Sequence, residues 1–380
     1  MLDRREFIRS AAAVALTVSP AVQGASPKRK FTAEAYARAT VIDALGGPGE
    51  FDPKAAPGAP LSAQALADVK ASGVTAVNLT VSSVGNGQGK FEETVAGIAY
   101  WEREIAARPE TFVKVLAARD LNAAKAAARM GIIYGFQDTS MLDADLSRLE
   151  MFWGLGVRIV QPVYNRRNLM GDGCLEPADG GLSTLGRELI AEINRLGILL
   201  DLSHAGPRTI SEGIAASRAP AAITHTACRA LVDGPRNTHD SELKALADRG
   251  GVAGIYFMPF LRPSAQPHAE DLIRHLEHAV NVCGEDHVGL GTDGLLSGVR
   301  LDSEYAEFHR KFYEGRQKAG IAAPGEAADV FNLIPEYNDA RRFLTLANDL
   351  SDRGWPQRRI EKILGANFAR LFSAVWKPQV

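Results

Sequence analysis

Two apolar segments of the sequence each end on a histidine, and a third ends on an aspartate. These segments are residues 197–204, 219–225 and 287–293, which end on His204, His225 and Asp293. A short, nearly continuous apolar run is typical of a buried parallel strand. Because the carboxyl ends of parallel strands meet at one edge of a sheet, we expect the three side chains to lie close together. Two imidazoles and a carboxylate can bind zinc with one position open for water, which indicates a metal-assisted hydrolase.

The elements that must position these side chains alternate between strand type and helix type from Val41 onward. About eight strands are expected, the number in a TIM (β/α)8 barrel, so we predict one α/β barrel domain. The carboxyl ends of its strands would also bring Gln137, Tyr164 and Asn165 to the mouth of the barrel. A helix is predicted over residues 183–194, with a serine as its N-cap. Histidines outside the strand ends, such as His275 and His309, are expected on the surface.

The alternation lapses between Leu295 and Asn332. We interpret this stretch as an insertion after the last barrel strand, at the same end of the barrel as the site. Long excursions of this kind often serve as lids. A helix that seals the barrel by packing is the alternative, and the sequence favours neither.

The N-terminal residues have the composition of an export signal. Arg4 and Arg5 precede a small-residue apolar stretch, and residues 1–24 resemble a twin-arginine signal. We therefore predict a periplasmic protein whose domain covers residues 30–380, with no stable membrane span after signal removal. The net charge of −2 and the lack of a basic stripe argue against a nucleic-acid partner. Homodimer formation is left open.

Several short motifs occur in a family-like order. They are Asp201-Leu-Ser-His204, Thr224-His225-Thr226, Pro235-Arg236-Asn237 and Gly291-Thr292-Asp293. Together they resemble the membrane dipeptidase (renal dipeptidase-like) family of metallopeptidases, over residues 41–372. The resemblance implies a two-zinc centre in which His204 and His225 are ligands. It also implies that Arg236 holds the substrate carboxylate and that Asp293 takes part in proton transfer.

The sequence departs from the family pattern at the other site positions. Leu45 and Gly47 stand where the family has a His-x-Asp pair, Gln137 where it has a bridging glutamate, and Tyr164 where it has a histidine. Two divalent ions about 3.5–4 Å apart repel each other, and a neutral amide cannot offset that repulsion. We therefore expect one zinc ion or none, held by His204 and His225 with help from Gln137 or Asp293.

The predicted function is periplasmic, metal-dependent hydrolysis of dipeptides or small amides. Asp293 would be the general base or an added metal ligand, and Tyr164 would either donate a hydrogen bond to the oxyanion or simply pack. Arg236, Asn165 and Asn237 would bind the substrate. Two alternatives remain: a metal-poor relative that carries out a tailoring or isomerising step on a peptide-derived metabolite, and a binding protein without catalytic activity.

Overall fold

The computed structural model describes residues 31–376, apart from residues 83 and 86–87. The predicted export signal, residues 1–24, lies outside the described residues. Within the part of the chain that is described, no helix is both long and apolar enough to cross a membrane.

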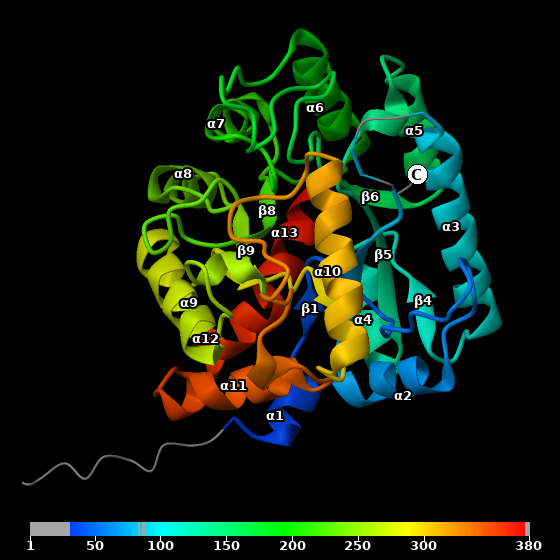
Figure 1. Cartoon of the computed structure of the whole chain (residues 1–380), viewed down its shortest axis with the longest axis vertical. Helices are drawn as coiled ribbons and strands as arrows, with labels where there is room; N and C mark the ends of the chain where they lie inside the picture. Colours follow the sequence, from blue (N-terminus) through cyan, green and yellow to red (C-terminus); the bar gives the residue numbers. More distant parts are fainter. Residues whose placement is uncertain (1–30, 83, 86–87, 377–380) are drawn as a thin grey trace, which may run out of the picture.

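Helices and parallel strands alternate along the chain (Figure 1). The strands are β1 Ile42–Asp43, β2 Gly46–Gly47, β3 Ala76–Thr80, β4 Phe112–Lys114, β5 Met130–Phe136, β6 Val157–Val160, β7 Leu199–Leu200, β8 Ala222–Thr226, β9 Val252–Ile255, β10 Val288–Leu290 and β11 Gly294–Leu295. The helices are α1 Ala33–Arg38, α2 Ala63–Ser72, α3 Lys90–Ala107, α4 Arg119–Ala126, α5 Ser147–Gly154, α6 Thr184–Leu196, α7 Pro207–Ala216, α8 Asp240–Asp248, α9 Ala269–Cys283, α10 Ser303–Lys318, α11 Arg342–Asp352, α12 Gln357–Glu361 and α13 Asn367–Val375. The predicted α/β class is confirmed.

The strands form two larger parallel sheets. One has the order β1-β3-β5-β6-β7, with β4 paired to β5, and the other has the order β10-β9-β8. Backbone hydrogen bonds join the sheets at both ends: Leu202 N–H donates to Ala222 O over 2.8 Å, and Ala44 N–H donates to Leu290 O over 2.9 Å. A short parallel pair, β11 with β2, adds to the second junction. Consequently, the carboxyl ends of all these strands lie on one side of the molecule.

The predicted helix over residues 183–194 is confirmed as α6. Ser183 caps it, because its hydroxyl accepts a hydrogen bond from Gly186 N–H over 2.9 Å. The helix ends at Gly197, whose φ of 67° is a backbone conformation that residues other than glycine rarely adopt. The chain then enters β7 directly, and this short turn places His204 just beyond that strand.

A layer of apolar side chains fills the sheet interior at the end away from the site. Its members come from most of the strands and from α13, which lies across that end: Ile42, Ala76, Ile133, Ile159, Leu199, Ala222, Val252, Phe368 and Phe372. Above this layer the interior becomes polar, with Asn78, Gln161, Asp201 and Thr224 buried. The predicted surface location of His275 and His309 is wrong, because both are buried under neighbouring loops.

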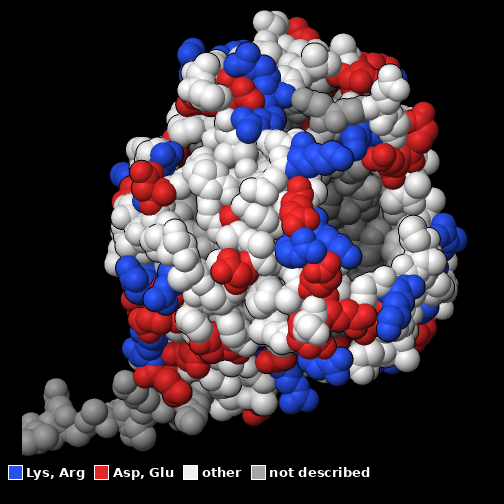
Figure 2. Space-filling model, viewed as in Figure 1, with Lys and Arg blue, Asp and Glu red and all other residues white. Residues whose placement is uncertain are grey.

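The stretch between residues 295 and 332 contains α10, which runs across the face of the molecule shown in Figure 1. The same face is hollowed between α10 and α3 (Figure 2). The loop that follows α10 returns to the carboxyl ends of the strands, where Gly320 and Ile321 accept hydrogen bonds from Arg166 and Asn165. The excursion therefore lies against the candidate site.

Candidate functional site

The two strand-end histidines lie next to each other. His204 follows β7 and His225 lies within β8, and their ring centroids are 4.9 Å apart. Both side chains are buried. The ends of β7 and β8 thus bring these two imidazoles together, as the sequence predicted.

Both ring nitrogens of His204 have partners. Nδ1 lies 2.5 Å from Asn165 Oδ1, and Nε2 lies 3.0 Å from Arg236 Nη2. Since Asn165 Nδ2 donates to the carbonyl of Ile321, its oxygen faces the ring, and His204 Nδ1 carries the proton. His204 Nε2 therefore offers a lone pair, which accepts a hydrogen bond from the guanidinium of Arg236. Burial, then Arg236, His225 and Arg316, hold the pKa of His204 well below its ordinary value.

His225 is oriented by a chain of hydroxyl groups. Its Nδ1 lies 2.9 Å from Thr224 Oγ1, and this hydroxyl donates its own proton to Asp201 Oδ2 over 2.6 Å. Because a hydroxyl has one proton, Thr224 accepts from His225, which places the imidazole proton on Nδ1. The opposite nitrogen, Nε2, is buried and has no hydrogen-bond partner among the described residues. Burial and then Arg236 keep the pKa of His225 well below its ordinary value.

Tyr164 joins the histidines to the excursion after β11. Its ring stacks on His204 with centroids 4.1 Å apart, and its hydroxyl accepts a hydrogen bond from Arg316 Nη1 over 3.1 Å. Arg316 lies near the end of α10 and is paired with Glu326 at 2.6 Å. Burial raises the pKa of the Tyr164 phenol, an effect that Arg316 opposes. Sequence reasoning missed Arg316 and Glu326, since the loss of alternation was the only signal in that stretch.

Arg236 is a buried cation without a carboxylate partner among the described residues. Its guanidinium lies 5.9 Å from the ring centroids of both Tyr256 and Phe260. The next residue, Asn237, holds this segment in place, because its amide donates to the carbonyls of Val232 and Phe260. The predicted substrate contacts of Asn237 and Asn165 remain predictions, and both amides already serve the protein's own hydrogen bonds.

Asp293 lies at the same mouth, between β10 and β11. Its φ of 56° is left-handed, a conformation that aspartate and asparagine tolerate better than most residues. Its backbone N–H donates to Leu45 O over 2.8 Å. Burial raises the pKa of Asp293 to about 6, while Arg236 and Arg316 act in the opposite direction. The carboxyl group is therefore poised to change charge near neutral pH.

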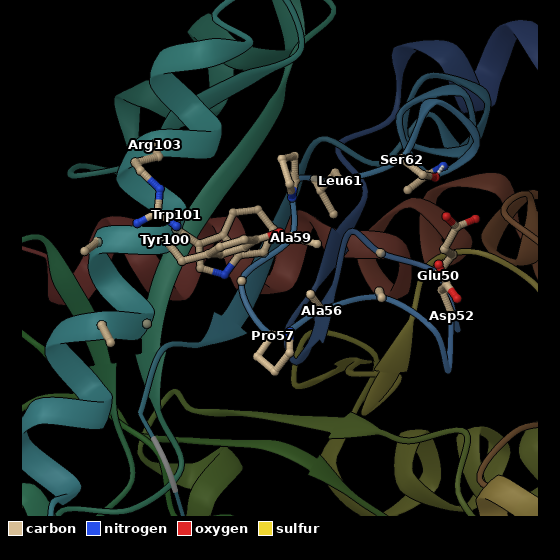
Figure 3. A pocket seen from close by; sticks show the side chains of 18 of the residues that line it. Glu50, Asp52, Ala56, Pro57, Ala59, Leu61, Ser62, Tyr100, Trp101 and Arg103 are labelled. Atoms are coloured by element: carbon tan, nitrogen blue, oxygen red, sulfur yellow. Dashed lines mark hydrogen bonds between the residues drawn. The ribbon is translucent and has the colours of Figure 1, made fainter.

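Gln137 is directed toward the neighbouring strand. Its Nε2 donates to Thr80 Oγ1 at the end of β3 over 2.7 Å. Thr80 in turn lines a cavity of about 900 Å³ between α3 and the loop that precedes α2. Figure 3 shows Tyr100, Trp101 and Arg103 on α3 facing residues 56–61 across this cavity. Sequence reasoning did not identify this cavity, which forms between two segments that carry no recognisable motif.

The residues present do not fit a zinc site as they lie. Zinc in a protein is held by about four ligands, of which at least three are side chains. Among the described residues there is no group of three or more histidine, cysteine, aspartate or glutamate side chains that could hold a metal ion. The lone pair of His204 Nε2 is also used by Arg236. The predicted ligands His204, His225 and Gln137 stay predictions, as does the zinc ion.

Asp43 ties the end of β1 to the residue before Asp293. Its two oxygens accept from Thr292 N–H over 2.8 Å and from the Thr292 hydroxyl over 2.6 Å. Burial raises the pKa of Asp43 to about 7, although these hydrogen bonds and Arg342 lower it. The position of Asp293 thus depends on a carboxyl group that is costly to ionise.

Comparisons with known proteins agree with this arrangement. Residues 61–304 match the model of the family described as Membrane dipeptidase (Peptidase family M19). A solved amidohydrolase from Pseudomonas aeruginosa is 33% identical, with a TM-score of 0.77 over 90% of this chain and 98% of that chain. An uncharacterized protein of Klebsiella pneumoniae is 28% identical over 69% of this chain and 88% of its own length. A metallo peptidase from Rhodobacter sphaeroides, at 21% identity, 89% and 99% coverage and a TM-score of 0.71, shares the fold.

Asp43→Asn should make the protein's stability less dependent on pH. The pKa of Asp43 in the folded protein, about 7, lies above that of an unfolded aspartate, so the folded state binds the extra proton between these values. The free energy of unfolding of the wild type should therefore fall as pH rises from 5 to 8. The variant should lack this contribution.

Thermal unfolding of both proteins at pH 5 and pH 8 measures the difference, with Asp248→Asn on the surface as a control. If the stability of the wild type and of Asp43→Asn changed equally with pH, this role of Asp43 would be contradicted.

Proposed function

Because the chain belongs to the membrane dipeptidase family (Peptidase family M19), a family of dipeptidase-like metallohydrolases, we propose that it hydrolyses a dipeptide or a small amide bearing a carboxylate. The observation that carries this proposal is Arg236. A buried guanidinium without a carboxylate partner among the described residues is costly, and an anionic ligand would remove much of that cost. The substrate carboxylate is the group that this side chain would bind, through two parallel N–H donors.

The neighbouring residues supply the groups that amide hydrolysis needs. Asp293, as the carboxylate, would take a proton from water as the water oxygen attacks the amide carbon, and would pass that proton to the departing amine. The Tyr164 hydroxyl accepts from Arg316, so its own proton is directed elsewhere and would donate to the developing oxyanion. Each of these steps uses this chain's own residues.

The cavity between α3 and the loop before α2 has room for the rest of such a substrate. It is lined by small side chains together with Tyr100 and Trp101, which can contact an apolar or aromatic group. Its lining includes Thr80, whose hydroxyl accepts a hydrogen bond from Gln137 at the strand ends. The cavity lies beside the strand ends, and none of the residues that line it is a histidine, Arg236 or Asp293.

Two further features of the proposal concern the fold and the location. The hydrogen bonds that join the two sheets at both junctions support one closed, eight-stranded barrel with the α10 stretch as an insertion. Residues 1–24 support export by the twin-arginine route, and residues 30–380 would then form the periplasmic domain.

Arg236→Ala should lower kcat/KM selectively for substrates that have a free carboxylate. A hydrogen-bonded ion pair of this kind is worth about 1.5–3 kcal/mol, so the loss should be roughly 10- to 100-fold. The same dipeptides with an amidated C-terminus should lose much less. A panel of free and amidated dipeptides measures the ratio, and Arg229→Ala, which removes a half-buried arginine paired with Asp233, is the matched control. Equal losses of kcat/KM on free and amidated dipeptides would contradict the proposed role of Arg236.

The proposed general base predicts an acidic limb in the pH profile. Hydrolysis requires the ionised form of Asp293, so kcat/KM should fall as pH drops through about 6. Asp293→Asn keeps a residue that tolerates the left-handed backbone and should lose roughly 10²- to 10⁴-fold in kcat. Full turnover in this variant would assign the base elsewhere. Unchanged ligand binding with no turnover in either protein would instead favour a binding protein.

Replacement of Arg4 and Arg5 by lysine should stop export. The twin-arginine route reads this pair, so the protein should accumulate in the cytoplasm with its N-terminal segment uncleaved. Cell fractionation followed by N-terminal sequencing measures both effects. An Arg29→Lys variant is the control, and normal processing of the double variant would exclude this route.

A further inference from the structure

The guanidinium of Arg236 lies where a metal ligated by His204 would have to lie. We propose that Arg236 takes the place of the metal ion at this site, so that the protein binds a carboxylate-bearing ligand without zinc. The inference concerns what occupies the site and does not depend on which substrate is hydrolysed.

The contact with His204 uses the lone pair that zinc would need. The His204 ring holds its proton on Nδ1, toward Asn165, and Nε2 accepts from Arg236 Nη2 at 3.0 Å. A zinc ion on Nε2 would lie about 2.0–2.1 Å from it and so, along the same line, about 1 Å from Nη2. The ion and the guanidinium therefore cannot occupy their positions together, and their like charges would also repel.

The other imidazole cannot make a site by itself. His225 Nε2 is buried and has no partner among the described residues, and Thr224 keeps the proton on Nδ1. That nitrogen is a competent ligand, but one neutral imidazole is far from the three side chains that zinc sites require. The described residues provide no group of three metal-binding side chains to which it could contribute.

Arg236 is held in this position from several sides. Its guanidinium lies 5.9 Å from the ring centroids of both Tyr256 and Phe260, and its carbonyl accepts from the Thr226 hydroxyl over 3.2 Å. Asn237 fixes the following residue through the carbonyls of Val232 and Phe260. Moving the guanidinium away from His204 would break this hydrogen bond of a buried charge and disturb these neighbours.

The same geometry leaves donors for an anion. A guanidinium has five N–H groups, and His204 takes one of them. With no carboxylate partner among the described residues, Arg236 can present two parallel donors to a ligand carboxylate. A cation fixed by the chain thus provides the positive charge that a metal ion would otherwise supply.

Removal of Arg236 should raise the affinity of the two imidazoles for zinc, and metal binding tests this directly. The full chain and Arg236→Ala are dialysed against zinc and, separately, against cobalt(II), and then compared by elemental analysis and visible absorption. We expect the wild type to retain no stoichiometric metal. Arg236→Ala, with both imidazole lone pairs free and space for water, should bind zinc at least about tenfold more tightly. Adding His225→Ala to that variant should abolish the gain.

Arg229→Ala is the matched control, because it removes an arginine that pairs with Asp233 and does not touch His204. It should behave as the wild type. If Arg236→Ala does not fold, Arg236→Gln retains a neutral donor and should show a smaller gain in zinc affinity. Stoichiometric zinc in the wild type that His225→Ala removes would overturn the proposal. Equal zinc affinity in wild type and in the folded Arg236 variants would overturn it as well.

Discussion

The Asp201 carboxylate joins the two sheets at the place where the site forms. It accepts hydrogen bonds from the backbone and hydroxyl of Ser203, at 3.0 and 2.7 Å, and from the backbone and hydroxyl of Thr224, at 3.0 and 2.6 Å. Burial raises its pKa, and these four donors oppose that effect. Because His204 follows Ser203 and His225 follows Thr224, the carboxylate also sets the separation of the two imidazoles. A buried acid is thus tolerated because it connects the end of β7 to β8.

Asn165 extends this arrangement to the excursion after β11. One side of its amide accepts from His204 Nδ1, and the other donates to Ile321 O over 2.7 Å. The loop after α10 and the tautomer of His204 therefore depend on the same side chain. These contacts do not decide between a lid and a helix that seals the barrel, but they show that the position of the segment is coupled to the site. The hydrogen bond from Arg316 to Tyr164 is a second contact of this kind.

The sequence was most informative where a local pattern determines the structure. Apolar runs that end on His204, His225 and Asp293 predicted strand ends, and a serine predicted the start of α6. The contacts of these residues could not be predicted, because they depend on rotamers and on partners far along the chain. Arg316 reaches Tyr164 across about 150 residues, and the cavity beside α3 forms between segments without a motif. His309 was misplaced because its burial comes from packing against Phe331 and not from its own helix pattern.

The balance of charge at the site explains why the site differs from the two-zinc centre that the family resemblance implies. A two-zinc centre needs anionic ligands, and the corresponding positions here are Leu45, Gly47 and Gln137, which are neutral. The remaining imidazoles are held neutral by burial, while Arg236 and Arg316 add two positive charges. Arg316 is paired with Glu326, whereas Arg236 has no carboxylate partner within the described part of the chain. A pocket that loses anions and keeps an unpaired cation favours an anion over a metal ion. The substitutions at the first metal position and the contact of Arg236 with His204 are therefore consistent with each other, since both favour binding of a carboxylate.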